Sequence, residues 1–156
     1  MEHDRGWFTN ENCSVARTLE VIGERWTMLV LREAFFRVRR FEEFQRNTGA
    51  ARNILSDRLR TLVDHGILER RQYQERPPRF EYRLTERGLD LYPVLIALMQ
   101  WGDKHAPGEM GPPVMLEHRT CGNVTSPALV CSECGEPLSA RDMRVLPGPG
   151  AIRRGA

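Results

Sequence analysis

The last third of the sequence contains four side chains that can bind a transition metal: His118, Cys121, Cys131 and Cys134. Their spacing reads H-x2-C-x9-C-x2-C, and a Gly follows the second member of each pair. Gly at these positions lets backbone amides point at the thiolate sulfurs. Three thiolates and one imidazole are a donor set suited to a tetrahedral structural zinc ion. Four protein ligands leave no open coordination position, so we do not expect a catalytic metal.

Two other interpretations of these four residues stay open. In a reducing compartment the thiols could remain free as small apolar side chains, with His118 at the surface. Cys131 and Cys134 could instead form a disulfide that acts as a redox switch, as C-x-x-C pairs do. Pro- and Gly-rich stretches bracket the segment from about residue 114 to residue 146. So short a segment buries little, and a metal would explain how it stays folded.

A polar helix face in the middle of the chain is the second candidate site. Residues 50–65 predict a helix that ends at Gly66, with Leu55, Leu59 and Leu62 forming one apolar stripe. The polar face opposite this stripe consists of Arg52, Asn53, Ser56, Asp57 and Arg60. In a major groove Arg suits guanine, Asn suits adenine, and Asp could accept from cytosine or orient an Arg. An ordinary amphipathic helix of a helical domain is the alternative.

The elements around this helix predict a helix-turn-helix followed by a wing. A shorter helix, predicted from residue 41 to residue 46, precedes it across a turn at residues 47–49. Residues 67–73 and 80–84 predict two strands around an Arg- and Pro-rich loop. The arginines of this hairpin that could contact phosphate or the minor groove are Arg71, Arg76 and Arg79. A solvated charged loop is the alternative for them.

Helices predicted on either side of this module could form a dimer interface. Apolar periodicity and capping residues predict helices over residues 14–22, 26–36 and 86–105. The last of these carries more apolar residues than one stripe requires, so we expect part of it to pack on a second copy of the chain. Pro93 should kink or break this helix near its first turns. A helix sandwiched within one chain is the alternative to a homodimer formed through residues 14–22 and 86–105.

Composition narrows the class of protein. At 156 residues and 40% apolar content, the chain supports one compact domain and a small appendage. It has no run of about 18 apolar residues and no signal-peptide apolar core, so we expect a cytoplasmic protein without a membrane span. The net charge is only +2, but residues 36–83 contain twelve Arg against seven Asp or Glu. No nucleophile–base set or open metal site is present at credible spacing, so we do not expect an enzyme.

Several motifs follow one another in a fixed order: Cys13, IGERW at 22–26, RRFEEF at 39–44, LSDRLRTL at 55–62, HGIL at 65–68, YRLTERG at 82–88, and LYPVL at 91–95 followed by Trp101. In this order, over residues 12–105, the chain resembles the HxlR-type family of bacterial winged-helix transcription regulators, relatives of the MarR-type regulators. The resemblance implies a homodimer on double-stranded DNA with a pseudo-palindromic operator. One helix 50–65 would enter each of two major grooves, and the wings would lie on the backbone or minor groove.

The resemblance also implies a role for Cys13. In some HxlR-type regulators a Cys near this position senses electrophiles or oxidants, and its modification changes DNA binding. A half-buried small residue at the dimer edge is the alternative. The family often has Pro after this Cys, whereas Ser14 follows it here.

For the function of the whole chain, a further alternative to a DNA-binding regulator is an RNA- or protein-interaction module that works through the Cys-rich tail. No small effector can be named from the sequence.

Together these patterns predict a mainly α fold with a small β-hairpin wing and a zinc-ribbon-like C-terminal appendage. The expected organisation is an N-terminal arm over residues 1–11, then a DNA-binding and dimerisation domain over residues 12–106. A Cys- and His-containing extension follows at residues 107–146, and a flexible tail at residues 147–156.

Overall fold

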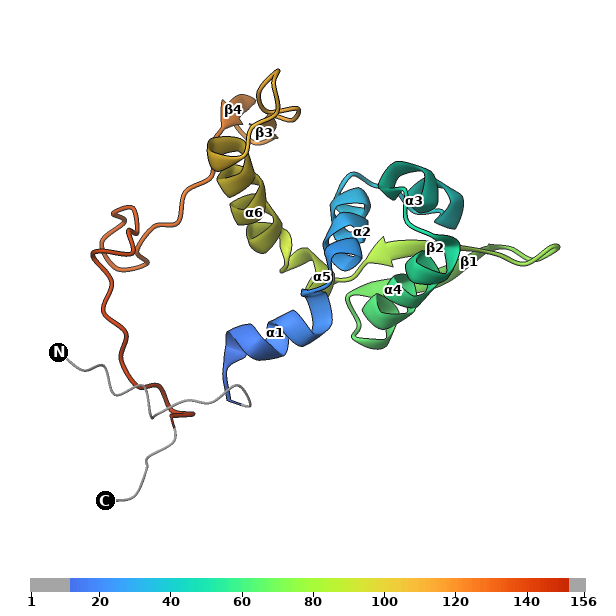
Figure 1. Cartoon of the computed structure of the whole chain (residues 1–156), viewed down its shortest axis with the longest axis horizontal. Helices are drawn as coiled ribbons and strands as arrows, with labels where there is room; N and C mark the ends of the chain where they lie inside the picture. The colour runs from blue at the N-terminus through green and yellow to red at the C-terminus, as the bar shows by residue number, and fades with distance from the viewer. Residues whose placement is uncertain (1–11, 152–156) are drawn as a thin grey trace. The chain divides into compact units, whose positions relative to one another are not determined.

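A computed structural model describes residues 12–151 of the chain (Figure 1). The predicted arm over residues 1–11 and the last five residues of the predicted tail lie outside the described residues. The chain divides into two compact units between Leu95 and Ile96, and each unit is described by itself. None of the described helices is long and apolar enough to cross a membrane.

The first unit has the element order of a winged helix. Its helices and strands are α1 (Ser14–Ile22), α2 (Arg25–Phe35), α3 (Phe41–Thr48), α4 (Arg52–Asp64), β1 (Leu68–Gln74), β2 (Arg79–Leu84) and α5 (Glu86–Leu89). The remaining elements are α6 (Tyr92–His105), β3 (Leu116–His118) and β4 (Asn123–Thr125). The mainly α fold with a β-hairpin wing is therefore confirmed.

The core of the first unit is built on the apolar stripe of α4. Leu55, Leu59 and Leu62 are all fully buried, as predicted, and they pack with Phe44 of α3 and with α2. The rings of Phe44 and Tyr82 meet edge to face at 6.4 Å, which joins the wing to this core. Burial of the stripe fixes the rotation of α4 about its axis, so the opposite face is turned outward.

The helix-turn-helix differs in its boundaries from the prediction. α3 continues to Thr48, whose hydroxyl donates a 2.7 Å hydrogen bond to the Phe44 carbonyl, and Gly49 ends the helix at φ +73°. α4 begins at Arg52 instead of residue 50, because Ala50 is buried in the core and Ala51 is extended. The turn between the helices is therefore centred on residues 49–51.

The wing is an antiparallel pair in which Leu68 faces Leu84 and Arg70 faces Tyr82, with an irregularity between Gln72 and Gln74. Because side chains alternate along a strand, Arg70 shares the core-facing side with Leu68. The outer side carries two ion pairs, Arg71 with Glu69 and Arg83 with Glu81. Arg70 therefore lies on one face of the wing, and Arg71 and Arg83 lie on the other.

The predicted long helix 86–105 is wrong as a single element. It is divided into α5 and α6 by Asp90 and Leu91, just before Pro93. Pro has no amide hydrogen to donate and is tolerated only in the first turn of a helix, so the break predicted near Pro93 is confirmed. α5 is held by Thr85, whose hydroxyl accepts from the Gly88 amide at 3.1 Å.

The second unit consists of the greater part of α6 and the tail. β3 and β4 form a short antiparallel hairpin in which His118 faces Asn123. The Gln100 side chain of α6 donates to the Pro127 carbonyl at 2.6 Å and to the Ser126 hydroxyl at 3.2 Å. These hydrogen bonds attach the hairpin to α6.

Candidate nucleic-acid interface

The predicted polar face of α4 is presented to solvent. Arg52, Asn53, Ser56 and Arg60 are exposed, and Asp57 is half-buried. Arg52 and Asn53 are the first two residues of the helix, the end from which a recognition helix reaches base edges. The structure therefore brings the five predicted residues of this face together.

Asp57 is occupied by two neighbouring arginines. Its carboxylate accepts a hydrogen bond from Arg60 and forms a 3.3 Å ion pair with Arg58. Of the two roles predicted for Asp57, orienting an arginine agrees with this geometry. Arg60 is consequently held on the outer face of α4.

A basic groove runs beside the start of α4. It has a volume of about 620 Å³ and lies between α3, the first residue of α4 and the wing. Its arginines are Arg40, Arg46, Arg52, Arg70 and Arg79, against two acidic residues, Glu42 and Glu43. An excess of guanidinium groups over carboxylates in a concave surface creates a positive potential suited to a phosphate backbone.

Three of these arginines lie over aromatic rings. Arg52 lies 4.8 Å from the ring centroid of Phe41. Arg40 lies 5.0 Å from that of Tyr73, and Arg70 lies 3.4 Å from that of Phe80. Such cation–π contacts restrict a flexible guanidinium without using its hydrogen-bond donors. The donors of the groove therefore remain available to a ligand.

Sequence reasoning missed Arg40, Arg46 and Arg70 among the groove arginines. Arg70 could have been found from strand alternation, because it shares a side of β1 with the buried Leu68. No local signal identified Arg40, whose position over Tyr73 depends on how α3 and the wing pack.

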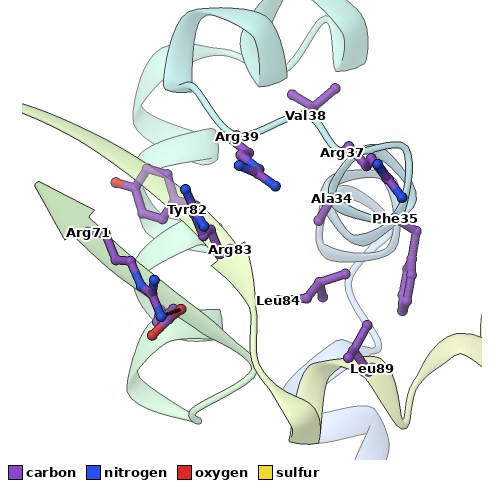
Figure 2. Close-up of a pocket in the computed structure, with 11 residues that line it drawn as sticks. Ala34, Phe35, Arg37, Val38, Arg39, Arg71, Tyr82, Arg83, Leu84 and Leu89 are labelled. Atoms are coloured by element: carbon purple, nitrogen blue, oxygen red, sulfur yellow. Dashed lines mark ion pairs between the residues drawn. The ribbon is translucent and has the colours of Figure 1, made fainter. Parts of the chain in front are cut away.

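The predicted wing arginines are not all in one place. Arg79 lines the basic groove, and Arg76 is exposed in the turn between the strands. Arg71 instead lines a separate cavity of about 390 Å³ between α2, the outer side of the wing and α5 (Figure 2). There it forms a 2.5 Å ion pair with Glu69. Arg71 is thus set apart from the groove residues.

The first Cys/His pair lies at the tip of the tail hairpin. Nδ1 of His118 is 3.4 Å from Sγ of Cys121, and Gly122 follows at φ +69°. The pKa of the Cys121 thiol is lowered, first by the backbone N–H of Asn123 and then by its side chain. The amide of that side chain donates to the Cys121 carbonyl at 3.3 Å.

The second pair, Cys131 and Cys134, lies in a similar turn. The backbone N–H groups of Cys134 and Glu133 lower the pKa of the Cys131 thiol, and Gly135 follows at φ +77°. Within residues 12–151, no three His, Cys, Asp or Glu side chains form one cation-binding group. The structure therefore forms the two predicted pairs separately.

Cys13 is a half-buried free thiol at the N-terminal end of α1, where its carbonyl accepts a 3.0 Å hydrogen bond from the Arg17 amide.

Comparisons with known proteins agree with this geometry. Residues 21–110 match the HxlR-like helix-turn-helix family. An HTH-type transcriptional regulator of Mycobacterium tuberculosis is 53% identical over 140 residues, which cover 90% of this chain and 89% of the relative. An alignment of that length necessarily includes most of the tail.

Solved structures extend the comparison. The crystal structure of the transcription factor PA1607 is 41% identical, with a TM-score of 0.75, and the match covers 86% of this chain and 94% of that one. The oxidised form of the redox regulator HypR is 34% identical, with a TM-score of 0.57, over 62% of this chain and 100% of that one. The first two relatives are described as regulators of transcription and HypR as a redox regulator, in agreement with the regulator class expected from the sequence. The chain therefore belongs to the HxlR-like helix-turn-helix family of transcriptional regulators.

Proposed function

We propose that the protein is a dimeric regulator that reads a pseudo-palindromic operator through α4 and the adjoining basic groove. This proposal rests on one observation: the polar face of α4 and the basic groove are continuous. Arg52 belongs to both, because it is the first residue of α4 and also lines the groove. A helix in the major groove would therefore bring the groove arginines against the neighbouring phosphates.

The residues of this surface have different proposed roles. Arg52 and Asn53 read base edges, and Arg60, oriented by Asp57, reads a base or positions the helix. Arg40, Arg70 and Arg79 bind phosphates, which set affinity and orientation without base preference. Arg76, in the exposed turn of the wing, contacts the backbone or the minor groove.

Exposed apolar side chains support a homodimer through α1 and α6. In the single chain, Val15 and Leu19 of α1 are more than half exposed, and so are Leu98 and Trp101 of α6. Exposed apolar residues clustered on helices mark association surfaces. A second copy of the chain would cover them and would place two α4 helices on one duplex, as a palindromic operator requires.

Selection from random-sequence duplex DNA by the full-length protein tests this function. The expected result is an enriched inverted repeat with half-sites about one helical turn apart, bound by a particle of twice the chain mass in sedimentation. Binding that depends only on salt, with no enriched sequence, would contradict the proposal. It would favour a general nucleic-acid binder or a module that works through the tail.

Thiol sensing through Cys13 is a second candidate function. Its support is the position of the half-buried free thiol next to α1, one of the two helices of the proposed dimer interface. The similarity to HypR, described as a redox regulator, also favours it. The test is the operator affinity of Cys13→Ser with and without peroxide. An oxidant response that is unchanged in the variant would remove this role for Cys13.

A further inference from the structure

The tail folds without a hydrophobic core. No residue from 106 to 151 is buried, and its large apolar side chains, among them Leu129 and Val145, are exposed. The segment nevertheless contains the β3–β4 hairpin and a second set of backbone hydrogen bonds around Cys131. A small segment that buries so little apolar surface usually requires a cross-link, a metal or a partner to stay ordered.

The two Cys-containing turns have the same backbone geometry. In the first, the Gly122 amide donates to the His118 carbonyl at 2.8 Å, and in the second, the Gly135 amide donates to the Cys131 carbonyl at 2.9 Å. Both glycines have positive φ. Each turn therefore places its two ligand-type residues, three positions apart, within one tight loop.

Each turn is also supported by flanking strands. β3 and β4 pair across the first turn, with His118 opposite Asn123. Across the second, Val130 forms a bridge with Pro137, and the Cys131 amide donates to the Glu136 carbonyl at 2.8 Å. Two hairpins that each carry a pair of ligand-type residues at the tip can supply the two halves of a four-ligand zinc site.

The first pair has the separation of two ligands on one metal ion. A Zn–S bond of about 2.3 Å and a Zn–N bond of about 2.1 Å, at a tetrahedral angle, place the two ligand atoms about 3.6 Å apart. The distance between Nδ1 of His118 and Sγ of Cys121 is 3.4 Å. Nine residues separate Cys121 from Cys131, and an extended chain of that length spans about 30 Å. The connection is long enough for the two tips to meet.

We propose that His118, Cys121, Cys131 and Cys134 bind one structural zinc ion per chain, which joins the two hairpin tips of the tail. Zinc fits this set because it prefers four ligands of nitrogen and thiolate sulfur in tetrahedral geometry. All four coordination positions are filled by protein, so the ion stabilises the tail and does no chemistry. This inference does not depend on the proposed operator binding.

The first experiment measures zinc in the untagged full-length protein, purified without chelators, by elemental analysis. We expect about one zinc ion per chain. Cys121→Ser and Cys134→Ser should each reduce the zinc content at least tenfold. Cys13→Ser is the matched control, because it makes the same substitution outside the tail, and it should retain the ion.

The His ligand allows a conservative rescue. His118→Ala should lose zinc, whereas His118→Cys should retain it, because four thiolates also form a closed zinc site. If His118 only shaped the turn and bound no metal, the His118→Ala and His118→Cys proteins would not differ in zinc content in this way. Helical circular dichroism of each variant checks that the first unit remains folded.

Limited trypsin digestion gives a second readout in the same full-length protein. Chelation should accelerate cleavage at Arg119 and Arg141 in the tail, and added zinc should restore protection. Cleavage at the exposed Arg79 in the wing serves as the internal control and should not change. The proposal is overturned by wild-type protein that takes up less than about a tenth of an equivalent of zinc, or by Cys121→Ser protein that retains a full equivalent.

Discussion

The guanidinium of Arg52 lies over the ring of Phe41, with 4.8 Å between Cζ and the ring centroid. Arg52 is the first residue of α4 and Phe41 is the first residue of α3. The contact therefore ties the end of α4 that is proposed to read bases to the start of α3. A guanidinium that is already restricted loses less conformational entropy when it binds a base edge.

Arg52→Ala should weaken binding to the selected operator by about 1–3 kcal/mol and relax the base preference at one position of each half-site. Phe41→Leu should have a smaller effect of about 0.5–1 kcal/mol, because it removes the aromatic face and leaves the arginine in place. Fluorescence anisotropy with operator and mismatched duplexes measures both. If the Arg52→Ala variant bound every duplex more weakly by the same factor, Arg52 would be a phosphate contact.

Arg79→Ala should weaken binding to all duplexes alike and reduce the slope of log affinity against log salt concentration by about 0.9. The reason is its position in the basic groove. Arg71→Ala is the matched control, because Arg71 pairs with Glu69 on the outer side of the wing. Salt titrations of both variants test the difference. Equal changes in slope would show that the outer side of the wing also meets DNA.

Glu33 joins α2 to α3 in the core. Glu33 is only 5% exposed, and its carboxylate accepts a 2.8 Å hydrogen bond from the Asn47 side chain and pairs with Arg32 at 2.7 Å. Glu33→Ala should lower the free energy of unfolding by about 1–2 kcal/mol, since it removes both hydrogen-bonded contacts, while Arg32 and Asn47 are exposed enough to turn to water. Asn47→Ala should cost about 1 kcal/mol, and the double variant should cost less than the sum. Urea denaturation of the wild type, the two single variants and the double variant measures these free energies. If the losses in the two single variants added up to the loss in the double variant, the two residues would not interact.

Thr27 carries a fully buried hydroxyl that has no hydrogen-bond partner among residues 12–151. Thr27→Val replaces this hydroxyl with a methyl group of similar size and should raise the free energy of unfolding by about 1 kcal/mol. Thr48→Val is the matched control and should be destabilising, because the Thr48 hydroxyl donates to the Phe44 carbonyl. Thermal unfolding compares the two. A Thr27→Val protein less stable than wild type would contradict the assignment.

Features set by local pattern were predictable from the sequence. The stripe Leu55, Leu59 and Leu62 identified the buried face of α4, and hence its polar face, because helical periodicity alone determines which residues share a side. The break before Pro93 followed from the chemistry of proline.

Features set by packing between elements were not predictable. Arg70 and Arg71 are neighbours in the sequence, yet they lie on opposite sides of the wing. Strand alternation puts Arg70 on the side of Leu68, but the meeting of this side with α3 to form the groove depends on how the wing packs. The position of Arg52 over Phe41 likewise depends on how α3 and α4 pack. The Cys/His spacing predicted the two turns, but whether both turns meet on one ion is not a local property.

The most direct test of the account is the affinity of the full-length protein for its selected inverted repeat and for the same repeat with five base pairs inserted between the half-sites. Five base pairs rotate one half-site by about half a helical turn. A dimer that presents two α4 helices to one face of the duplex should then lose roughly a hundredfold in affinity, approaching its affinity for a single half-site. An affinity unchanged by the insertion would contradict the dimeric winged-helix account.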